Sequence, residues 1–370
     1  MIYLDYQATT PLAPEVAAAM RPWVEEKFAN PHSPSRWGRE AAAAIEVARS
    51  RIEQALGMAG GQFTFTSSAT EALNWALKGS FDSSKRPKLV AVATEHAAVL
   101  DTAEWLEGRG VEVARLQVGA DGLIDLKLAE AMIDDRTALV AVMLVNNEIG
   151  VIQPVAEVAR MARRVGALML CDAVQGFGRI PIPEGPDLIA ISGHKVHGPK
   201  GIGGLWIRSG AEPQPLLHGG GQEQGLRSGT LSPALCVGLG EAARLAGERR
   251  EGDLAHVKKL SEVALSTLGP EWILNGSGSQ RYHGNLNLRR DRLDGARLIS
   301  DMRNIAFSLG SACASGSGRP SHVLRAIGLS DREARSSIRI GFGRYTGEEE
   351  LASACRRINE EAHEQAQLPA

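Results

Sequence analysis

The hydrophobic positions of this chain follow two alternating patterns between residues 62 and 208. Leu139–Val145 is apolar throughout, as expected for a strand buried on both faces. In 154–165, apolar residues recur at helical spacing, with Pro154 in the first turn and Gly166 just past the end. The same patterns predict strands at 62–66, 88–93, 111–116, 168–171 and 187–191, and a helix at 69–79.

Strands that alternate with helices predict an α/β fold with a doubly wound, mostly parallel sheet covered on both faces. After residue 250 the charge rises, the helix predicted at 253–268 is amphipathic, and the strands become sparser and more polar. We therefore predict a large domain at 15–250 and a smaller α+β domain made of 1–14 and 251–370. Long Gly/Ser-rich loops at 217–229 and 310–319 are more often functional than idle.

Composition and charge narrow the possible function. Of 370 residues, 44% are hydrophobic and 23% charged, which is typical of a folded globular protein. The net charge of −2 argues against nucleic acid as the main partner. The longest apolar run, 138–145, is far shorter than the roughly 18 residues of a membrane span, and the first residues do not resemble a signal peptide. We therefore expect a cytoplasmic protein with no membrane segment.

The four cysteines contain no Cys-x-x-Cys pair, so no zinc ribbon or thioredoxin motif is predicted. They are also too few for a disulfide framework, and we expect free thiols in a reducing compartment and no bound metal. Cys171, Cys236 and Cys355 lie on predicted strands or helices, which favours packing roles. Cys313 differs, because it lies in a loop of small residues where an idle loop thiol and a mobile nucleophile are the two interpretations.

Lys195 follows one predicted buried strand and Asp172 ends another. Both therefore lie at the sheet edge where α/β proteins bind ligands. Lys195, in Ser192-Gly193-His194-Lys195, is a candidate Schiff-base lysine, although an exposed loop lysine is the commoner case. Asp172 could hold the proton on the nitrogen of a pyridine-ring cofactor, or simply cap a helix. Together the two residues point to pyridoxal phosphate.

A phosphate site and a stacking ring complete the pattern. Ser67-Ser68-Ala69-Thr70-Glu71 follows a predicted strand and opens a helix, whose free N–H groups favour an anion. An ordinary capping box from Ser68 to Glu71 is the equally weighted alternative. His96 follows the strand at 88–93, where its ring could stack on a planar cofactor, move protons or simply pack in the loop.

With its other motifs, the chain resembles the NifS/IscS group of cysteine desulfurases, which belong to the class V aminotransferase superfamily. The resemblance covers nearly the whole chain and implies the fold of PLP-dependent transferases of fold type I. The motifs that carry it are 3–11 (Tyr-Leu-Asp-Tyr-Gln-Ala-Thr-Thr-Pro), 30–33 (Asn-Pro-His-Ser), 69–71 (Ala-Thr-Glu), 94–96 (Thr-Glu-His), 146–150 (Asn-Asn-Glu-Ile-Gly), 193–195 (Gly-His-Lys), 227–230 (Arg-Ser-Gly-Thr), 310–313 (Gly-Ser-Ala-Cys) and 336–344 (Ser-Ser-Ile-Arg-Ile-Gly-Phe-Gly-Arg).

The resemblance also implies roles for individual residues. Lys195 matches the lysine that binds pyridoxal 5'-phosphate covalently, Asp172 the partner of the pyridine nitrogen, and Gln175 a residue near the ring hydroxyl. His96 matches the stacking histidine, which is also expected to act in catalysis. Thr230 matches a residue that reaches the phosphate of the neighbouring subunit, which implies a homodimer with shared sites. The remaining matches are Ala69, Thr70, Ser192 and His194 in the phosphate cup, and Asn147 and Arg339 at the substrate carboxylate, with Asn147 also at the cofactor.

Cys313 would then attack the sulfur of L-cysteine and carry it away as a persulfide, leaving L-alanine. The family implies a sulfur-acceptor or iron–sulfur scaffold protein as partner, and supply of sulfur for iron–sulfur clusters or other thio-cofactors. Gly318-Arg319-Pro320 replaces the family's usual leucine-glutamate-proline, and the C-terminal segment is short, so the acceptor is left open. Alternatives are a selenocysteine lyase or transaminase of the same superfamily, or a non-enzymatic scaffold, against which Lys195 and Asp172 argue.

Overall fold

The computed structural model describes residues 1–83, 85–309 and 320–367. Its centre is a seven-stranded sheet in the order β2-β8-β7-β6-β5-β3-β4. The five strands from β7 to β4 are parallel, whereas β8 and β2 continue the sheet in antiparallel pairing. The mostly parallel sheet is therefore confirmed, with an antiparallel edge. The strands are β2 (Gly61–Thr66), β3 (Lys88–Val92), β4 (Glu112–Leu116), β5 (Thr137–Met143), β6 (Leu168–Asp172), β7 (Leu188–Ser192) and β8 (Gly203–Arg208).

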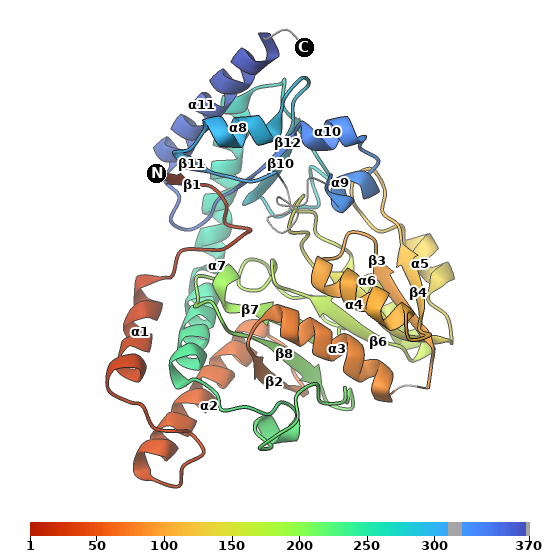
Figure 1. Ribbon diagram of the computed structural model, residues 1–370, viewed down its shortest axis with the longest axis vertical. Helices are drawn as coiled ribbons and strands as arrows, with labels where there is room; N and C mark the ends of the chain where they lie inside the picture. The colour runs from red at the N-terminus through yellow and green to blue at the C-terminus, as the bar shows by residue number, and fades with distance from the viewer. Residues whose placement is uncertain (84, 310–319, 368–370) are drawn as a thin grey trace.

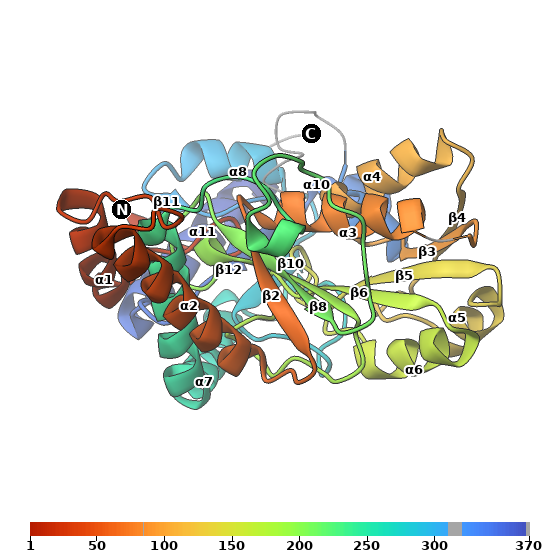
Figure 2. The same ribbon diagram turned by 90° about the horizontal axis from the view of Figure 1, so that it is seen from below.

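Helices cover both faces of this sheet, as Figure 2 shows. On one face α3 (Ala69–Ser83) and α4 (Ala97–Glu107) pack with the strands around a cluster that includes Trp75 and Leu170. On the other lie α5 (Leu126–Met132) and α6 (Val155–Val165), with α2 (Arg36–Leu56) beside β2. Both the start of α6 and its end at Gly166 (φ 71°) lie close to where the sequence places them. Every residue of β5 is buried, so both faces of the strand are covered, which explains its continuous apolar run.

A smaller region lies above the sheet in Figure 1. It contains the antiparallel sheet β12-β10-β9, the parallel pair β1-β11, and α8 to α11. The helix α1 (Pro14–Glu25) packs on α7 (Pro233–Leu268), which runs unbroken through the predicted domain boundary at residue 250 and extends beside both regions. The elements are β1 (Ile2–Tyr3), β9 (Ile273–Leu274), β10 (Asn285–Arg289), β11 (Ile305–Ala306), β12 (Ser337–Gly341), α8 (Gly295–Asp301), α9 (His322–Ala326), α10 (Asp331–Arg335) and α11 (Glu348–Gln367).

Three of the cysteines have the packing role that the sequence predicts. Cys171, Cys236 and Cys355 are buried, at 0%, 1% and 0% exposure, and each is a free thiol. Burial raises the pKa of all three thiols, which keeps them in the unreactive protonated form. Among the helices described, none combines the length and apolar character that crossing a membrane requires.

Candidate active site

A cavity of about 420 Å³ opens where the parallel strands end. Its walls come from the turns after β3, β5, β6 and β7, from the start of α3, and from β12 of the smaller region. Because the carboxyl ends of parallel strands meet at one sheet edge, residues far apart in sequence converge here. The cavity brings together ten of the predicted site residues: Ala69, Thr70, His96, Asn147, Asp172, Gln175, Ser192, His194, Lys195 and Arg339.

Lys195 lies in a short 3₁₀ turn, η1 (Gly193–Lys195), directly after β7. Its amine donates hydrogen bonds to the peptide carbonyls of Gln7, at 2.5 Å, and Ala8, at 2.7 Å. These carbonyls belong to the segment that follows β1, so the N-terminus of the chain forms part of the cavity wall. The lysine is therefore not an exposed loop residue, which was the commoner alternative for an isolated lysine.

Asp172 ends β6 and is 4% exposed. One of its oxygens accepts the backbone N–H of Val174 at 3.0 Å. Burial raises the pKa of the Asp172 carboxyl, while the nearby His96 and Lys195 act in the opposite direction. A buried carboxylate of this kind is stabilised by a cationic N–H donor, which is what a protonated pyridine nitrogen provides.

His96 caps the N-terminus of α4, because its Nδ1 accepts the backbone N–H of Ala98 at 3.1 Å. In the neutral ring the proton is then on Nε2. His194 is held by its Nδ1 contact with the Thr9 hydroxyl, at 3.1 Å. Burial and the positive charge of Lys195 lower the pKa of His194 to about 4, so its ring is neutral at pH 7.

Gln175 is buried and uses both ends of its amide within the protein. Its Nε2 donates to the carbonyl of Gln7 at 2.9 Å, and its Oε1 accepts from Arg179 at 2.5 Å. The second N–H of the amide is the group that a ring hydroxyl could meet.

The N-terminus of α3 faces the cavity with Ser68, Ala69 and Thr70. The capping box predicted from Ser68 to Glu71 forms only in part. The Ser68 hydroxyl accepts the Glu71 N–H at 3.3 Å, but the Glu71 carboxylate accepts from Ser67 and pairs with Arg227 at 2.7 Å. With Glu71 held away from Ser68, the helix start keeps the open, positive end that suits an anion.

Gly203 on β8 makes room for this helix start. A Cβ at residue 203 would lie 2.8 Å from the Ala69 backbone nitrogen and 2.5 Å from the Ile191 carbonyl oxygen. We predict that Gly203→Ala displaces the α3 N-terminus and weakens binding of pyridoxal 5'-phosphate by about tenfold or more. Titration of the visible absorbance tests this. Gly247→Ala in α7, where nothing lies within 4 Å, is the matched control, and equal affinities of the two variants would contradict the prediction.

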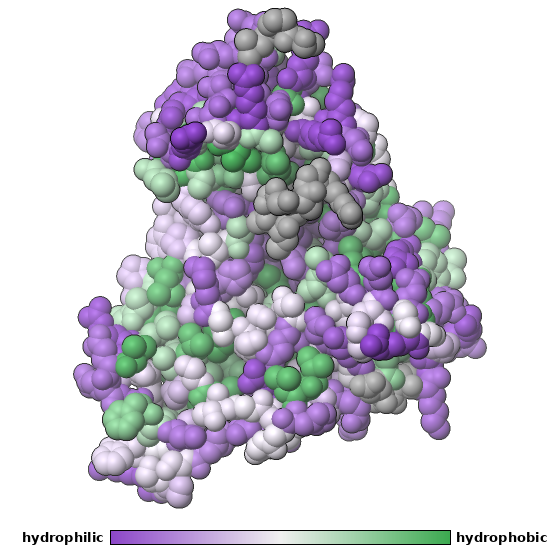
Figure 3. Space-filling model, viewed as in Figure 1, coloured by the Kyte–Doolittle hydropathy of each residue, from purple (hydrophilic) through white to green (hydrophobic). Residues whose placement is uncertain are grey.

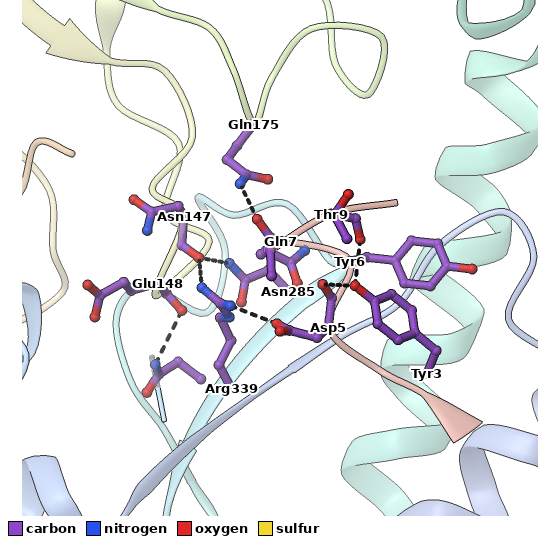
Figure 4. Close-up of polar contacts among 12 residues, drawn as sticks. Tyr3, Asp5, Tyr6, Gln7, Thr9, Asn147, Glu148, Gln175, Asn285 and Arg339 are labelled. Carbon is purple, nitrogen blue, oxygen red and sulfur yellow. Dashed lines mark hydrogen bonds and ion pairs between the residues drawn. The ribbon is translucent and has the colours of Figure 1, made fainter. Parts of the chain in front are cut away.

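Arg339 on β12 reaches the opposite wall of the cavity, and Figure 4 shows it between two segments of the chain. It is 1% exposed, pairs with the Asp5 carboxylate at 2.7 Å, and donates to the carbonyl of Asn147 at 2.9 Å. Its Nε is buried and has no hydrogen-bond partner among the described residues. The guanidinium is thus fixed in place with donors still available for a carboxylate.

We predict that Arg339→Lys raises the KM for L-cysteine by about tenfold or more, with a smaller change in kcat. A lysine keeps the charge but replaces the planar fork with a point charge, so it cannot bind a carboxylate through two parallel hydrogen bonds. Steady-state kinetics measure both constants. The exposed Arg335, substituted in the same way, is the control, and an unchanged KM in Arg339→Lys would contradict this assignment.

Two predicted site residues do not lie in the cavity as described. Thr230 is exposed and outside it. Cys313 lies outside the described residues. The structure also adds cavity residues that the sequence reasoning did not select, among them Gln7, Ala8, Glu148 and His322. Gln7, Ala8 and Glu148 lie inside motifs quoted for the resemblance, and those motifs were the signal that could have identified them. His322 lies in none of these motifs.

The cavity fits pyridoxal 5'-phosphate at each end of that molecule. An open helix N-terminus is available for the phosphate, a buried carboxylate for the ring nitrogen, and an amine for the aldehyde. The orphaned Nε of buried Arg339 adds a donor for a substrate carboxylate.

Comparisons with known proteins agree with this geometry. The family model "Aminotransferase class-V" matches residues 2–353. "Cysteine desulfurase IscS" of Rickettsia bellii is 46% identical over 97% of this chain and 91% of its own length. A solved structure titled "NIFS-LIKE PROTEIN" superposes with a TM-score of 0.90 at 34% identity, covering 97% of this chain and 98% of that one. Another, titled "SspA in complex with cysteine", gives a TM-score of 0.83 at 36% identity, covering 94% and 100%. The chain therefore belongs to the class-V aminotransferase family and, within it, to the cysteine desulfurases.

Proposed function

We propose that this enzyme moves the sulfur of L-cysteine to the thiol of Cys313 and releases L-alanine. In this reaction the carbon–sulfur bond of the substrate breaks and a sulfur–sulfur bond forms on Cys313. The substrate and one thiol become alanine and one persulfide, so atoms and electrons balance without an added oxidant or reductant. The observation that carries the proposal is the meeting of Lys195, Asp172 and Arg339 in one cavity of a chain from this family.

Pyridoxal 5'-phosphate is the cofactor, and when bound it stabilises negative charge at the substrate's α-carbon. Asp172 is proposed to hold the ring nitrogen, Ala69, Thr70, Ser192 and His194 the phosphate, and His96 and Gln175 the ring. Lys195 is proposed to bind the cofactor covalently and, once released, to remove the α-proton. Arg339 and Asn147 are proposed to hold the substrate carboxylate.

The described residues on either side of Cys313 support its role. Ser308 exchanges backbone hydrogen bonds with Arg339, at 3.2 and 2.6 Å. His322 lines the cavity, and the hydroxyl of Ser321 donates to the carboxylate of Glu148 there. The described residues on both sides of Cys313 therefore lie at the cavity wall or bond to residues that line it.

We propose that the enzyme works as a homodimer in which Thr230 reaches the partner's phosphate. Two observations support this: Thr230 is exposed and outside its own cavity, and large apolar side chains are exposed around α1 and α2, where Figure 3 shows apolar surface. Val24, Phe28 and Trp37 are 69%, 94% and 71% exposed. A surface of this kind is typical of protein–protein contact. We further propose a cytoplasmic location and transfer of the sulfur to an acceptor such as an iron–sulfur scaffold protein.

The deciding experiment incubates the purified protein with L-cysteine and a reductant, and measures sulfide and alanine together. Equal amounts of both are expected. Pyruvate in place of alanine would contradict the proposal. Amino-group transfer to a keto acid would support a transaminase, and alanine formed from selenocysteine but not from cysteine would support a selenocysteine lyase.

A further inference from the structure

The segment at residues 5–13, here called the N-terminal strap, lies against the turn that carries Lys195. The strap connects β1 to α1, and it contacts the cavity wall through Gln7 and Ala8. Figure 4 shows part of it, with the carbonyl of Gln7 accepting a hydrogen bond from Gln175. The two carbonyls that receive the Lys195 amine are consecutive residues of this strap.

Thr10 joins the strap to the lysine turn through three hydrogen bonds. Its backbone N–H and its hydroxyl both donate to the carbonyl of His194, at 2.9 and 3.0 Å. The same hydroxyl accepts the backbone N–H of His197 at 2.8 Å. Thr10 is 4% exposed, so water does not compete for these bonds. One buried side chain thus contacts the residues on both sides of Lys195.

The backbone of His197 shows what this contact holds in place. His197 has a φ of 62°, in the left-handed region that non-glycine residues rarely adopt. Its N–H is held by Thr10, its carbonyl accepts from Ala13 at 3.0 Å, and its ring Nδ1 lies 3.0 Å from the carbonyl of Pro11. Three strap residues therefore stabilise an unfavourable turn two residues after the lysine.

A peptide carbonyl interacts more strongly with the protonated form of a lysine amine than with the neutral form. A carbonyl oxygen only accepts hydrogen bonds, and an ammonium is a stronger donor than a neutral amine. Two carbonyls that face one amine therefore favour its protonated form. A lysine that has just taken a proton from a substrate is in that form.

We propose that the carbonyls of Gln7 and Ala8 are a binding site for the protonated Lys195 amine, and that Thr10 is the positioning residue for this site. This inference rests on the proposed role of Lys195 as the base. In that step the α-carbon–hydrogen bond breaks and a nitrogen–hydrogen bond forms on Lys195. The electron pair stays with the carbon, and the cofactor, when bound, would stabilise it there. The carbonyls stabilise the ammonium that results.

The test compares Thr10→Val, which removes the hydroxyl but keeps the shape, with Thr10→Ser, which keeps the hydroxyl. The first measurement is alanine formation from L-cysteine with hydrogen or deuterium at the α-carbon. We expect Thr10→Val to slow alanine formation by about tenfold and to increase the deuterium isotope effect, because stabilisation of the ammonium is lost. Thr10→Ser is expected to restore the wild-type values.

The second measurement uses the full chain freed of cofactor, and follows uptake of pyridoxal 5'-phosphate at pH 7 by visible absorbance. Only the neutral amine attacks the aldehyde. A site that favours the ammonium slows this attack, so Thr10→Val is expected to take up the cofactor several-fold faster while it forms alanine more slowly. Opposite changes in the two rates separate this site from general damage to the turn.

Several outcomes would overturn the inference. The inference would be wrong if Thr10→Val slowed both alanine formation and cofactor uptake, or changed neither rate. It would also be wrong if Thr10→Ser failed to restore the wild-type rates. If Thr10→Val does not fold, as judged by circular dichroism, Thr10→Ala replaces it in both measurements. Lys195→Ala that still forms the covalent absorbance band would instead overturn the proposed role of the lysine, so the two failures are distinguishable.

Discussion

Lys195→Ala is expected to abolish alanine formation, by about 10⁴-fold or more, and to remove the visible band of covalently bound cofactor. Among the described residues that line the cavity, Lys195 is the only lysine, and it lies in the turn directly after β7 at the sheet edge. The substitution removes both the covalent link and the proposed base. Activity is measured as alanine released, and the covalent link as the band that survives in the purified protein.

Lys200→Ala is the matched control for this experiment. Lys200 follows Lys195 by five residues and is exposed outside the cavity. Its removal is expected to leave both the band and the rate near those of the wild-type protein. If Lys195→Ala retained the band, the cofactor would be held covalently by another amine and the proposed mechanism would be wrong.

Cys313→Ser is expected to reduce cysteine-dependent alanine and sulfide formation to the background rate while the cofactor band remains. A serine hydroxyl has almost the same size as a thiol but cannot form a persulfide, so the sulfur has no acceptor. The retained band matters because it separates loss of the nucleophile from loss of the cofactor. Mass spectrometry after one turnover with cysteine should show an added sulfur atom on the wild-type chain and none on the variant.

The control for Cys313 is a cysteine that the fold keeps from reacting. Cys355 is 0% exposed in α11, and burial raises the pKa of its thiol to about 12. Cys355→Ala is expected to cost some stability by leaving a small cavity, but to keep the persulfide. A persulfide on a cysteine other than Cys313 would refute the assignment of the acceptor thiol. Full activity in Cys313→Ser would leave the selenocysteine lyase and transaminase alternatives.

Much of the fold follows from local patterns. The continuous apolar run at 139–145 indicates a strand with both faces covered, and the observed strand is Thr137–Met143. The strand ends earlier because the chain turns after Met143, where the backbone N–H is bonded to the carboxylate of Glu95 at 2.6 Å. That bond joins residues 48 positions apart, and no local pattern contains it. The helix expected after Pro233, which carries Cys236, and the helix predicted at 253–268 form one continuous helix, α7, which packs on α1, α2 and α11.

The candidate site, like the fold, follows partly from local sequence patterns and partly from the tertiary structure. The order of small motifs and the residue types within them pointed to the cofactor and to ten residues that the cavity brings together. A strand end followed by Lys195, or a helix start with hydroxyls, is a local feature that a sequence can show. Gln7 and Ala8 contribute backbone carbonyls, which every residue has, so their position depends on how the strap crosses the sheet edge.

The sequence by itself predicted six of the seven strands of the main sheet, the burial of three cysteines, the family resemblance and ten candidate residues that meet in the cavity, because these depend on residue type and short spacings. Only the tertiary structure decided that Arg339 is paired with Asp5, that Glu71 pairs with Arg227, and that Thr10 holds the turn of Lys195. These contacts join residues more than 150 positions apart in the sequence. Their distances are set by the packing of the whole fold, which leaves no periodic trace along the chain.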